Sequence, residues 1–228
     1  SGHTAFTWSD NGRTLVFSGI RGDALQLYRR GLAAAVAAPI EGTEGGQQPT
    51  VSSDGRWLAF WAKRTIRKVP LGGGPVVDVA SNVAKPAGMA WDEAGNLYFG
   101  RPDGPAWVVP ADSTPTRPVT ALGDGERAHV LPCLLPGGKV LLFTVRWRTW
   151  TWGDEQVVAQ TLRTGSRKLL LTDAADARYL PSGHLVFMRR GSLWAVGFDP
   201  VRQELVGSPV VVMDTVAQAL TGGNSNDI

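Results

Sequence analysis

A Leu-x-Phe motif recurs five times along the chain, each time shortly after a glycine in a turn-forming context. The clearest copy is the stretch 48–60, in which Asp54-Gly55 separates an apolar Val51 from Leu58-Ala59-Phe60. Apolar strands on either side of such a dipeptide are typical of a β-hairpin. The five phenylalanines are Phe17, Phe60, Phe99, Phe143 and Phe187, and the turn glycines are Gly12, Gly55, Gly95, Gly138 and Gly183.

These glycines lie 40 to 45 residues apart, which is the period of propeller blades rather than of shorter repeats. Frequent glycine and proline exclude helical repeats of similar length. The sequence therefore predicts an all-β fold: a β-propeller with five recognisable four-stranded blades and a sixth blade that is absent or incomplete. Residues 1–228 form a single domain, with a tail or the start of a sixth blade at 214–228 and with blades at approximately 4–40, 41–80, 83–121, 126–171 and 174–213.

Two local expectations follow from the repeat. The five phenylalanines should be equivalently buried between blades. The Ala-rich run 32–38 is helical by composition, but its repeat position makes it the outer strand of the first blade, ended by Pro39. Asp10 and Asp54 precede the turn glycines, and this recurrence favours turn capping over catalysis or calcium binding.

Composition narrows the classes of function. Charged residues make up 19% of the chain and the formal net charge is +3, spread over all repeats, so no nucleic-acid partner is expected. No stretch approaches the ~20 apolar residues of a membrane helix, which predicts no membrane insertion by this segment. Cys133 is the only cysteine, which excludes an intrachain disulfide.

The residues that carry catalysis or metal binding in other proteins form no pattern here. No nucleophile elbow or phosphate loop is present, and the three histidines lack metal-ligand spacing. We therefore expect no catalytic residues, no metal site and no cofactor. The interpretation of His129 stays open between a structural histidine and one facing the central channel. The residues expected to face that channel are His129, Arg127, Arg178 and Gln48.

The most unusual segment, 146–154, joins the second and third strands of the fourth repeat. Trp and Arg are enriched in binding hot spots, so this segment is a candidate partner-binding surface. The alternative is a strand extension whose indoles pack on the neighbouring blade, with Arg stacked on them. The candidate residues are Trp147, Trp150, Trp152, Arg146 and Arg148.

The amino-acid sequences of several repeats resemble those of a known family. The stretch 48–60 is similar to the repeat of TolB-type six-bladed propellers. The stretches 129–139, 177–187 and 191–199 resemble the TolB-like propellers attached to bacterial serine/threonine protein kinases. The resemblance covers about 6–212 and implies a propeller whose channel mouth docks partners. The kinase catalytic motifs are absent, so it implies no phosphotransfer.

These observations favour a non-enzymatic protein-interaction or sensory propeller module, a fragment of a larger bacterial signalling protein that binds a protein or peptide. The alternatives are an accessory propeller of a peptidase or lactonase-like hydrolase, and a structural assembly domain. An open arc of blades predicts a homodimer through unpaired blade edges. The alternatives are a tighter ring closed by five blades and a tail beyond Met213 that covers the edge of the first blade. Attachment to a membrane kinase would place the propeller in the periplasm.

Overall fold

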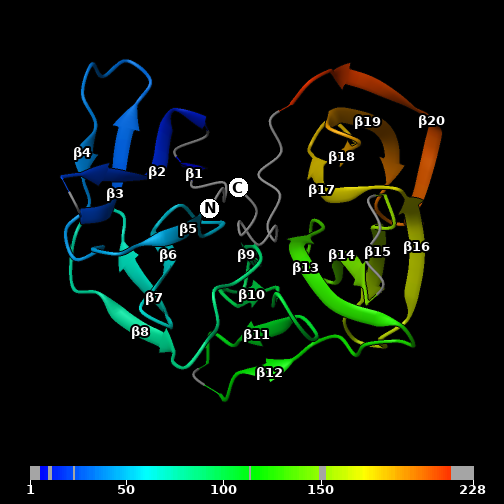
Figure 1. Cartoon of the computed structure of the whole chain (residues 1–228), viewed down its shortest axis with the longest axis horizontal. Helices are drawn as coiled ribbons and strands as arrows, with labels where there is room; N and C mark the ends of the chain where they lie inside the picture. The colour runs from blue at the N-terminus through cyan, green and yellow to red at the C-terminus, as the bar shows by residue number, and fades with distance from the viewer. Residues whose placement is uncertain (1–5, 10–11, 23, 113, 149–152, 217–228) are drawn as a thin grey trace, which may run out of the picture.

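The computed structural model describes residues 6–9, 12–22, 24–112, 114–148 and 153–216. It contains five four-stranded sheets arranged around a common centre (Figure 1). The strands are β1 (Phe6–Ser9), β2 (Thr14–Arg21), β3 (Ala24–Gly31) and β4 (Ala38–Pro39) in blade 1; β5 (Gln47–Val51), β6 (Trp57–Ala62), β7 (Thr65–Pro70) and β8 (Val77–Ala80) in blade 2; β9 (Met89–Trp91), β10 (Leu97–Phe99), β11 (Trp107–Val109) and β12 (Arg117–Pro118) in blade 3; β13 (Glu126–Leu134), β14 (Val140–Trp147), β15 (Gln156–Thr161) and β16 (Arg167–Thr172) in blade 4; and β17 (Ala175–Leu180), β18 (His184–Arg189), β19 (Ser192–Asp199) and β20 (Glu204–Met213) in blade 5.

Each blade is an antiparallel meander in which neighbours in sequence are neighbours in the sheet. The first strand of each blade lies nearest the centre and the fourth lies at the periphery (Figure 1). The predicted five-bladed all-β propeller is therefore confirmed. In the part of the chain that the structure describes, no helix is long and apolar enough to cross a membrane.

The first hairpin of each blade depends on its turn glycine. All five turn glycines have φ between +65° and +84°, a region that side chains with a Cβ rarely adopt. Asp54 and Asp92 stabilise two of these turns, because their carboxylates accept hydrogen bonds from the backbone N–H groups of Arg56 and Asn96 at 3.0 and 2.8 Å. These bonds confirm turn capping at Asp54 and show the same role at Asp92, while Asp10 lies outside the described residues.

A second irregularity recurs seven residues before the turn glycine. Gln48, Leu131 and Asp176 have φ between +53° and +56°, and each lies at a break in the pairing of its blade's first two strands. Gly88 holds the same place in blade 3. Such a bulge bends the strand and redirects its backbone groups. The N–H of Leu131 thereby donates to the carbonyl oxygen of Ala87 in the preceding blade, at 2.7 Å.

The Leu-x-Phe motif forms the contact between blades. We call the sheet face toward the preceding blade the backward face, and the opposite one the forward face. Phe60 of β6 packs with Val16 and Leu27 of blade 1, and Phe143 of β14 packs with Tyr98 and Val108 of blade 3. Phe99 and Phe187 contact the blades before them in the same way. The backward face of each of these blades thus shares one apolar core with the forward face of the blade before it.

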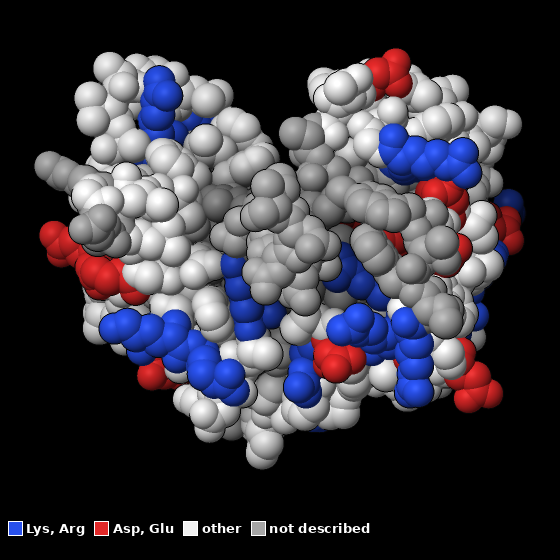
Figure 2. Space-filling view, in the orientation of Figure 1, with Lys and Arg blue, Asp and Glu red and all other residues white. Residues whose placement is uncertain are grey.

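Blade 1 is the exception, because the described residues place no blade against its backward face. The first strands of consecutive blades pack from β1 to β17, but no comparable packing joins blades 5 and 1 among the described residues. The outline of the molecule is notched between them (Figure 2). Phe17 is consequently only half-buried, whereas its four counterparts are at most 2% exposed. The expectation that all five phenylalanines are equivalent is wrong for Phe17.

The outer strand of blade 1 also differs from expectation. It comprises only Ala38–Pro39, and residues 32–37 form turns and bends instead of the predicted strand. Leu32 and Val36 are 66% and 79% exposed, so no neighbouring surface holds this run in an extended strand.

The packing predicts a graded response to truncation of the repeated phenylalanine. Phe60→Ala should lower the free energy of unfolding by about 3–5 kcal/mol, because it leaves a cavity in a closed interface. Phe17→Ala should cost roughly half as much or less, since this ring retains solvent contact in the folded protein. Urea denaturation of both variants measures the difference, and equal losses would contradict the open backward face of blade 1.

Candidate functional site

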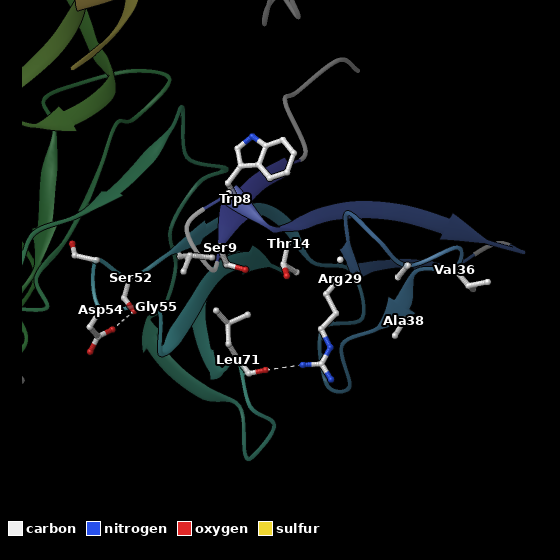
Figure 3. Close-up of a pocket in the computed structure, with 15 residues that line it drawn as sticks. Trp8, Ser9, Thr14, Arg29, Val36, Ala38, Ser52, Asp54, Gly55 and Leu71 are labelled. Atoms are coloured by element: carbon white, nitrogen blue, oxygen red, sulfur yellow. Dashed lines mark hydrogen bonds between the residues drawn. The ribbon is translucent and has the colours of Figure 1, made fainter. Parts of the chain in front are cut away.

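The first hairpin turns of all blades point to one side of the propeller, which we call the turn side. A hollow of about 900 Å³ lies there between blades 1 and 2 (Figure 3). Arg29 of β3 crosses this hollow, and its Nη1 donates to the carbonyl oxygen of Leu71 at 3.0 Å. The indole of Trp8 is directed away from Asp54 and Leu71 (Figure 3). The rest of the lining consists mainly of backbone and small side chains from the turns.

A second hollow of about 460 Å³ lies on the same side and draws its lining from blades 2 to 5. Two repeat positions supply most of it. Two residues before the turn glycine stand Ser53, Glu93, Pro136 and Pro181, and four residues before it stand Trp91, Leu134 and Tyr179. Ser53 lines both hollows, so the two adjoin at this residue, and we call them together the depression.

Direct bonds between neighbouring turns fix this depression. The hydroxyl of Ser53 donates to the carbonyl oxygen of Asp92 at 3.2 Å, and the N–H of Gly137 donates to Glu93 Oε1 at 3.3 Å. The side chains at the two repeat positions are therefore held in register from one blade to the next. The polar side chains of the second hollow come mainly from blades 2 and 3, and blades 4 and 5 contribute mainly apolar and proline side chains.

The charged residues that line the depression are three carboxylates and one guanidinium. They are Asp54, Asp92, Glu93 and Arg29. Hydrogen bonds from Ser52 and from the backbone and side chain of Arg56 lower the pKa of Asp54 to about 2, so it stays ionised. Asp92 is 7% exposed and accepts a hydrogen bond from the hydroxyl of Tyr98 at 3.2 Å. Burial, together with this charge, raises the pKa of Tyr98 to about 12.

A buried polar cluster lies between blades 3 and 4, near the opposite ends of the strands. His129 of β13 is fully buried and its ring contacts Phe143 at 4.5 Å between centroids. Its Nδ1 is 2.7 Å from Thr120 Oγ1 and its Nε2 is 2.9 Å from Glu126 Oε2. Arg167 Nη1 completes the cluster at 3.2 Å from the same Glu126 oxygen. The side chain of His129 thus lies between blades and does not line the channel as an open group.

The protonation states in this cluster follow from burial and from the partners. Burial lowers the pKa of His129, and the Glu126 carboxylate offsets only part of that effect. A neutral ring that donates from Nε2 to Glu126 and accepts the Thr120 hydroxyl at Nδ1 satisfies every group. Burial opposes ionisation of Glu126, but hydrogen bonds from Gly123 and His129 and the charge of Arg167 outweigh it. The pKa of Glu126 is therefore below its usual value.

The described residues of the segment 146–154 lie partly in the core and partly at the surface. Trp147, at the end of β14, packs against the core shared by blades 3 and 4. Burial lowers the pKa of Arg146 on the same strand, where the charge of Glu155 favours and that of Arg127 opposes its ionisation. Arg148 lines a hollow of about 530 Å³ together with Arg127 and Glu126. Trp150 and Trp152 lie outside the described residues.

The other residues expected at the channel have separate local roles. Arg127 is exposed and lies 3.7 Å from Asp103. Arg178 is half-buried, and its guanidinium donates to Asp176 at 2.8 Å and to the carbonyl oxygen of Pro132 at 3.0 Å. Gln48 is half-buried and forms the bulge of β5. The structure does not bring these residues together into one site with His129.

Outside the His129 cluster, carboxylates and a single thiol are further reactive groups in the described part of the chain. No group of three or more His, Cys, Asp or Glu side chains there could hold a metal ion. Cys133 is half-buried, and its Sγ lies 3.8 Å from the carbonyl oxygen of Leu134.

Comparison with known proteins identifies the fold only. No protein-family model and no curated protein matches the chain. Among solved structures, TolB from Acinetobacter baumannii superposes with a TM-score of 0.72 at 13% identity, over 93% of this chain and 55% of that one. The chain therefore spans about half the length of that protein. A putative TolB from Agrobacterium tumefaciens superposes with a TM-score of 0.67 at 18% identity, over 93% and 82% of the two chains.

The same architecture also occurs in an enzyme. An oligogalacturonate lyase in complex with manganese superposes with a TM-score of 0.61 at 14% identity, over 90% of this chain and 65% of that one. The chain thus has a TolB-like β-propeller fold, a fold that proteins of different function share.

The buried cluster predicts acid sensitivity between pH 7 and pH 5. The folded-state pKa of His129 is below the 6.5 of an unperturbed histidine, so as pH falls below 6.5 the unfolded chain binds a proton that the folded chain resists. The free energy of unfolding should fall over this range. The contribution of Glu126 is present above pH 4.5 and is lost only at lower pH.

Urea denaturation at several pH values tests this assignment. His129→Gln should be less stable at pH 7 but should show a flatter pH dependence between pH 7 and 5. His184→Gln is the matched control, because His184 is exposed at a hairpin turn. An equal pH dependence in the wild type and His129→Gln would rule out His129 as the source.

Proposed function

We propose that this propeller is a non-enzymatic binding module that docks an extended peptide segment of a partner protein on its turn side. One observation carries the proposal: blades 2 to 5 present the same two repeat positions around one hollow, which adjoins the hollow between blades 1 and 2 at Ser53. A row of regularly spaced sites fits an extended chain, whose side chains also recur at regular intervals.

The chemistry of the lining defines the segment. Trp91, Leu134 and Tyr179 supply a partly exposed apolar floor, and aromatic side chains of this kind are enriched in binding hot spots. Among the lining carboxylates Glu93 is exposed, whereas Asp54 is ion-paired with Arg56 at 2.6 Å and Asp92 is buried. The charge of Glu93 favours a segment with Lys or Arg among apolar residues. The same acidic lining disfavours a nucleic acid at this surface, because phosphates would meet carboxylates.

We place this binding activity in a bacterial signalling protein, where the propeller senses a partner outside the cytoplasm for a domain attached to it. The proposal rests on the TolB-like fold and on the resemblance of its repeats to kinase-attached propellers. The hydrolase-accessory role has weaker support. The described residues offer no set of metal ligands, and the hydroxyl, imidazole and carboxylate of Thr120, His129 and Glu126 are buried between blades.

A random-sequence peptide library displayed on phage tests the docking surface. Peptides selected on the wild-type protein should be enriched in Lys or Arg next to aromatic or aliphatic residues. Ser53→Trp fills the point where the two hollows meet and should weaken the selected peptides roughly tenfold or more, which is a loss of about 1.4 kcal/mol. Fluorescence anisotropy with a labelled peptide measures the Kd.

Ser166→Trp is the matched control. Ser166 is an exposed turn residue of blade 4 that lines neither hollow, so this variant should bind as the wild type does. Glu93→Arg should also weaken binding, because it reverses one of the carboxylates. Selected peptides that bind Ser53→Trp with unchanged Kd, or that are acidic, would refute the proposed site.

A further inference from the structure

The side of the propeller opposite the turn side carries a concentration of basic side chains. We call it the loop side, because it is formed by the hairpins between the second and third strands of each blade and by the links from one blade to the next. Lys and Arg side chains gather in an arc over blades 2, 3 and 4 (Figure 2). The basic patch, as we name it, consists of Lys63, Arg64, Lys85, Arg101, Arg127 and Arg148.

Backbone hydrogen bonds join the segments that carry the basic patch into one surface. Each bond links a hairpin of the loop side to the neighbouring link between blades. The N–H donors and carbonyl acceptors are Val83 and Arg64 at 2.8 Å, Ala87 and Gly100 at 2.9 Å, Gly104 and Arg127 at 2.9 Å, and Arg148 and Gly125 at 2.9 Å. The patch is therefore mounted on a continuous backbone frame that runs from blade 2 to blade 4.

Most charges of the basic patch are not neutralised by the described part of the chain. Five of its six members form no ion pair with a described carboxylate. The exception is Arg127, whose Nε lies 3.7 Å from Asp103 Oδ1, well beyond the roughly 2.7–2.9 Å of a charge-assisted hydrogen bond. On the turn side, by contrast, Arg56 pairs with Asp54 at 2.6 Å.

Acidic side chains are few on the same segments. The segments 62–65, 81–88, 100–105, 121–127 and 146–148 contain three acidic residues, Asp103, Asp124 and Glu126. Glu126 is already engaged by His129 and Arg167. Like charges held together without partners repel one another, so an anion that binds among them gains free energy from each.

Arg101, between the basic residues of blades 2 and 4, is held in place by an aromatic ring. The carbon of its guanidinium group lies 5.5 Å from the ring centroid of Trp107 on β11. Such stacking uses the face of the guanidinium group and leaves the N–H groups at its edge for a hydrogen-bonding partner. The spacing of these N–H groups matches the two oxygens of a carboxylate.

We propose that the basic patch binds an acidic segment of a protein, rich in Asp and Glu, that runs across blades 2 to 4. Four of the six cations are arginines, which pair with carboxylates in a bidentate manner. Asp103 is exposed among them. A protein segment can place a neutral or basic residue opposite Asp103, whereas the uniform charge of a nucleic acid or an anionic membrane meets it with repulsion. This surface lies on the other side from the depression, so one molecule binds both partners at once.

A fluorescein-labelled peptide of alternating Glu and Ser tests the patch by fluorescence anisotropy with the whole chain. Its affinity should fall steeply between about 0.05 and 0.3 M NaCl, because salt screens surface charges. Arg101→Glu should raise the Kd roughly fivefold or more, since it replaces an attraction by a repulsion. The double variant Lys63→Glu/Arg64→Glu should raise it roughly tenfold or more for the same reason.

Arg163→Glu is the matched control for Arg101→Glu. Arg163 is exposed in the turn between β15 and β16, on the turn side, and its replacement changes the net charge by the same amount. The control should leave the Kd unchanged within about twofold, because its charge is screened from the loop side. Ser53→Trp should also leave it unchanged, which separates this site from the one on the turn side. An unchanged Tm shows that each variant is folded.

Three results would overturn the inference. Absence of binding of the acidic peptide would show that the patch is not a site for it. Equal weakening by Arg163→Glu and Arg101→Glu would indicate a general attraction to a basic protein. Tighter binding of single-stranded DNA or of phosphatidylglycerol vesicles at the same salt concentration, lost in Arg101→Glu, would assign the patch to a phosphate-bearing partner instead.

Discussion

The fold depends on the contact between the backward face of one blade and the forward face of the blade before it. A four-stranded sheet with two apolar faces cannot bury either face alone, so each blade depends on its neighbours for stability, as in other repeat proteins. The Leu-x-Phe motif supplies one half of every contact, and Phe60, Phe99, Phe143 and Phe187 are buried for that reason. The same rule explains why Phe17 is only half-buried, since the described residues place no blade against the backward face of blade 1.

The turn side follows from the same repetition. A glycine with positive φ and, in two blades, a capping aspartate hold the first hairpin in a fixed shape, so equivalent positions of successive blades come side by side. The residue two places before the glycine does not pack in the core between blades, so its identity differs between blades. It is Ser53 in blade 2, Glu93 in blade 3, Pro136 in blade 4 and Pro181 in blade 5. A constant frame thus presents variable side chains, which is how a repeat protein acquires a specific binding surface.

The sequence predicts much of this fold because period, turn residues and alternation are local signals. It does not predict the half-exposed Phe17, since a repeat shows which face a residue occupies but not whether a neighbour covers it. The sequence also gives no sign of the bulges at Gln48, Leu131 and Asp176, because these residues are not glycines although their φ is positive. Blade 3 has a glycine, Gly88, at the equivalent position. The cluster around His129 joins residues as far apart as Thr120 and Arg167, and only the packing of blades brings them together.

Near-identical blade interfaces create a problem of order, because any Leu-x-Phe face could pack on any forward face. Polar contacts that differ from one interface to the next discriminate among them. Arg29 bonds to Leu71 between blades 1 and 2, Ser53 to Asp92 between blades 2 and 3, and Arg178 to Pro132 between blades 4 and 5. The buried His129 cluster does so between blades 3 and 4. A mispaired blade would leave the buried His129 without its partners, at about 1–3 kcal/mol for each lost bond. Arg29 and Ser53 are exposed and could bond to water instead. The apolar motif therefore stabilises the stack, while the buried cluster contributes most to its order.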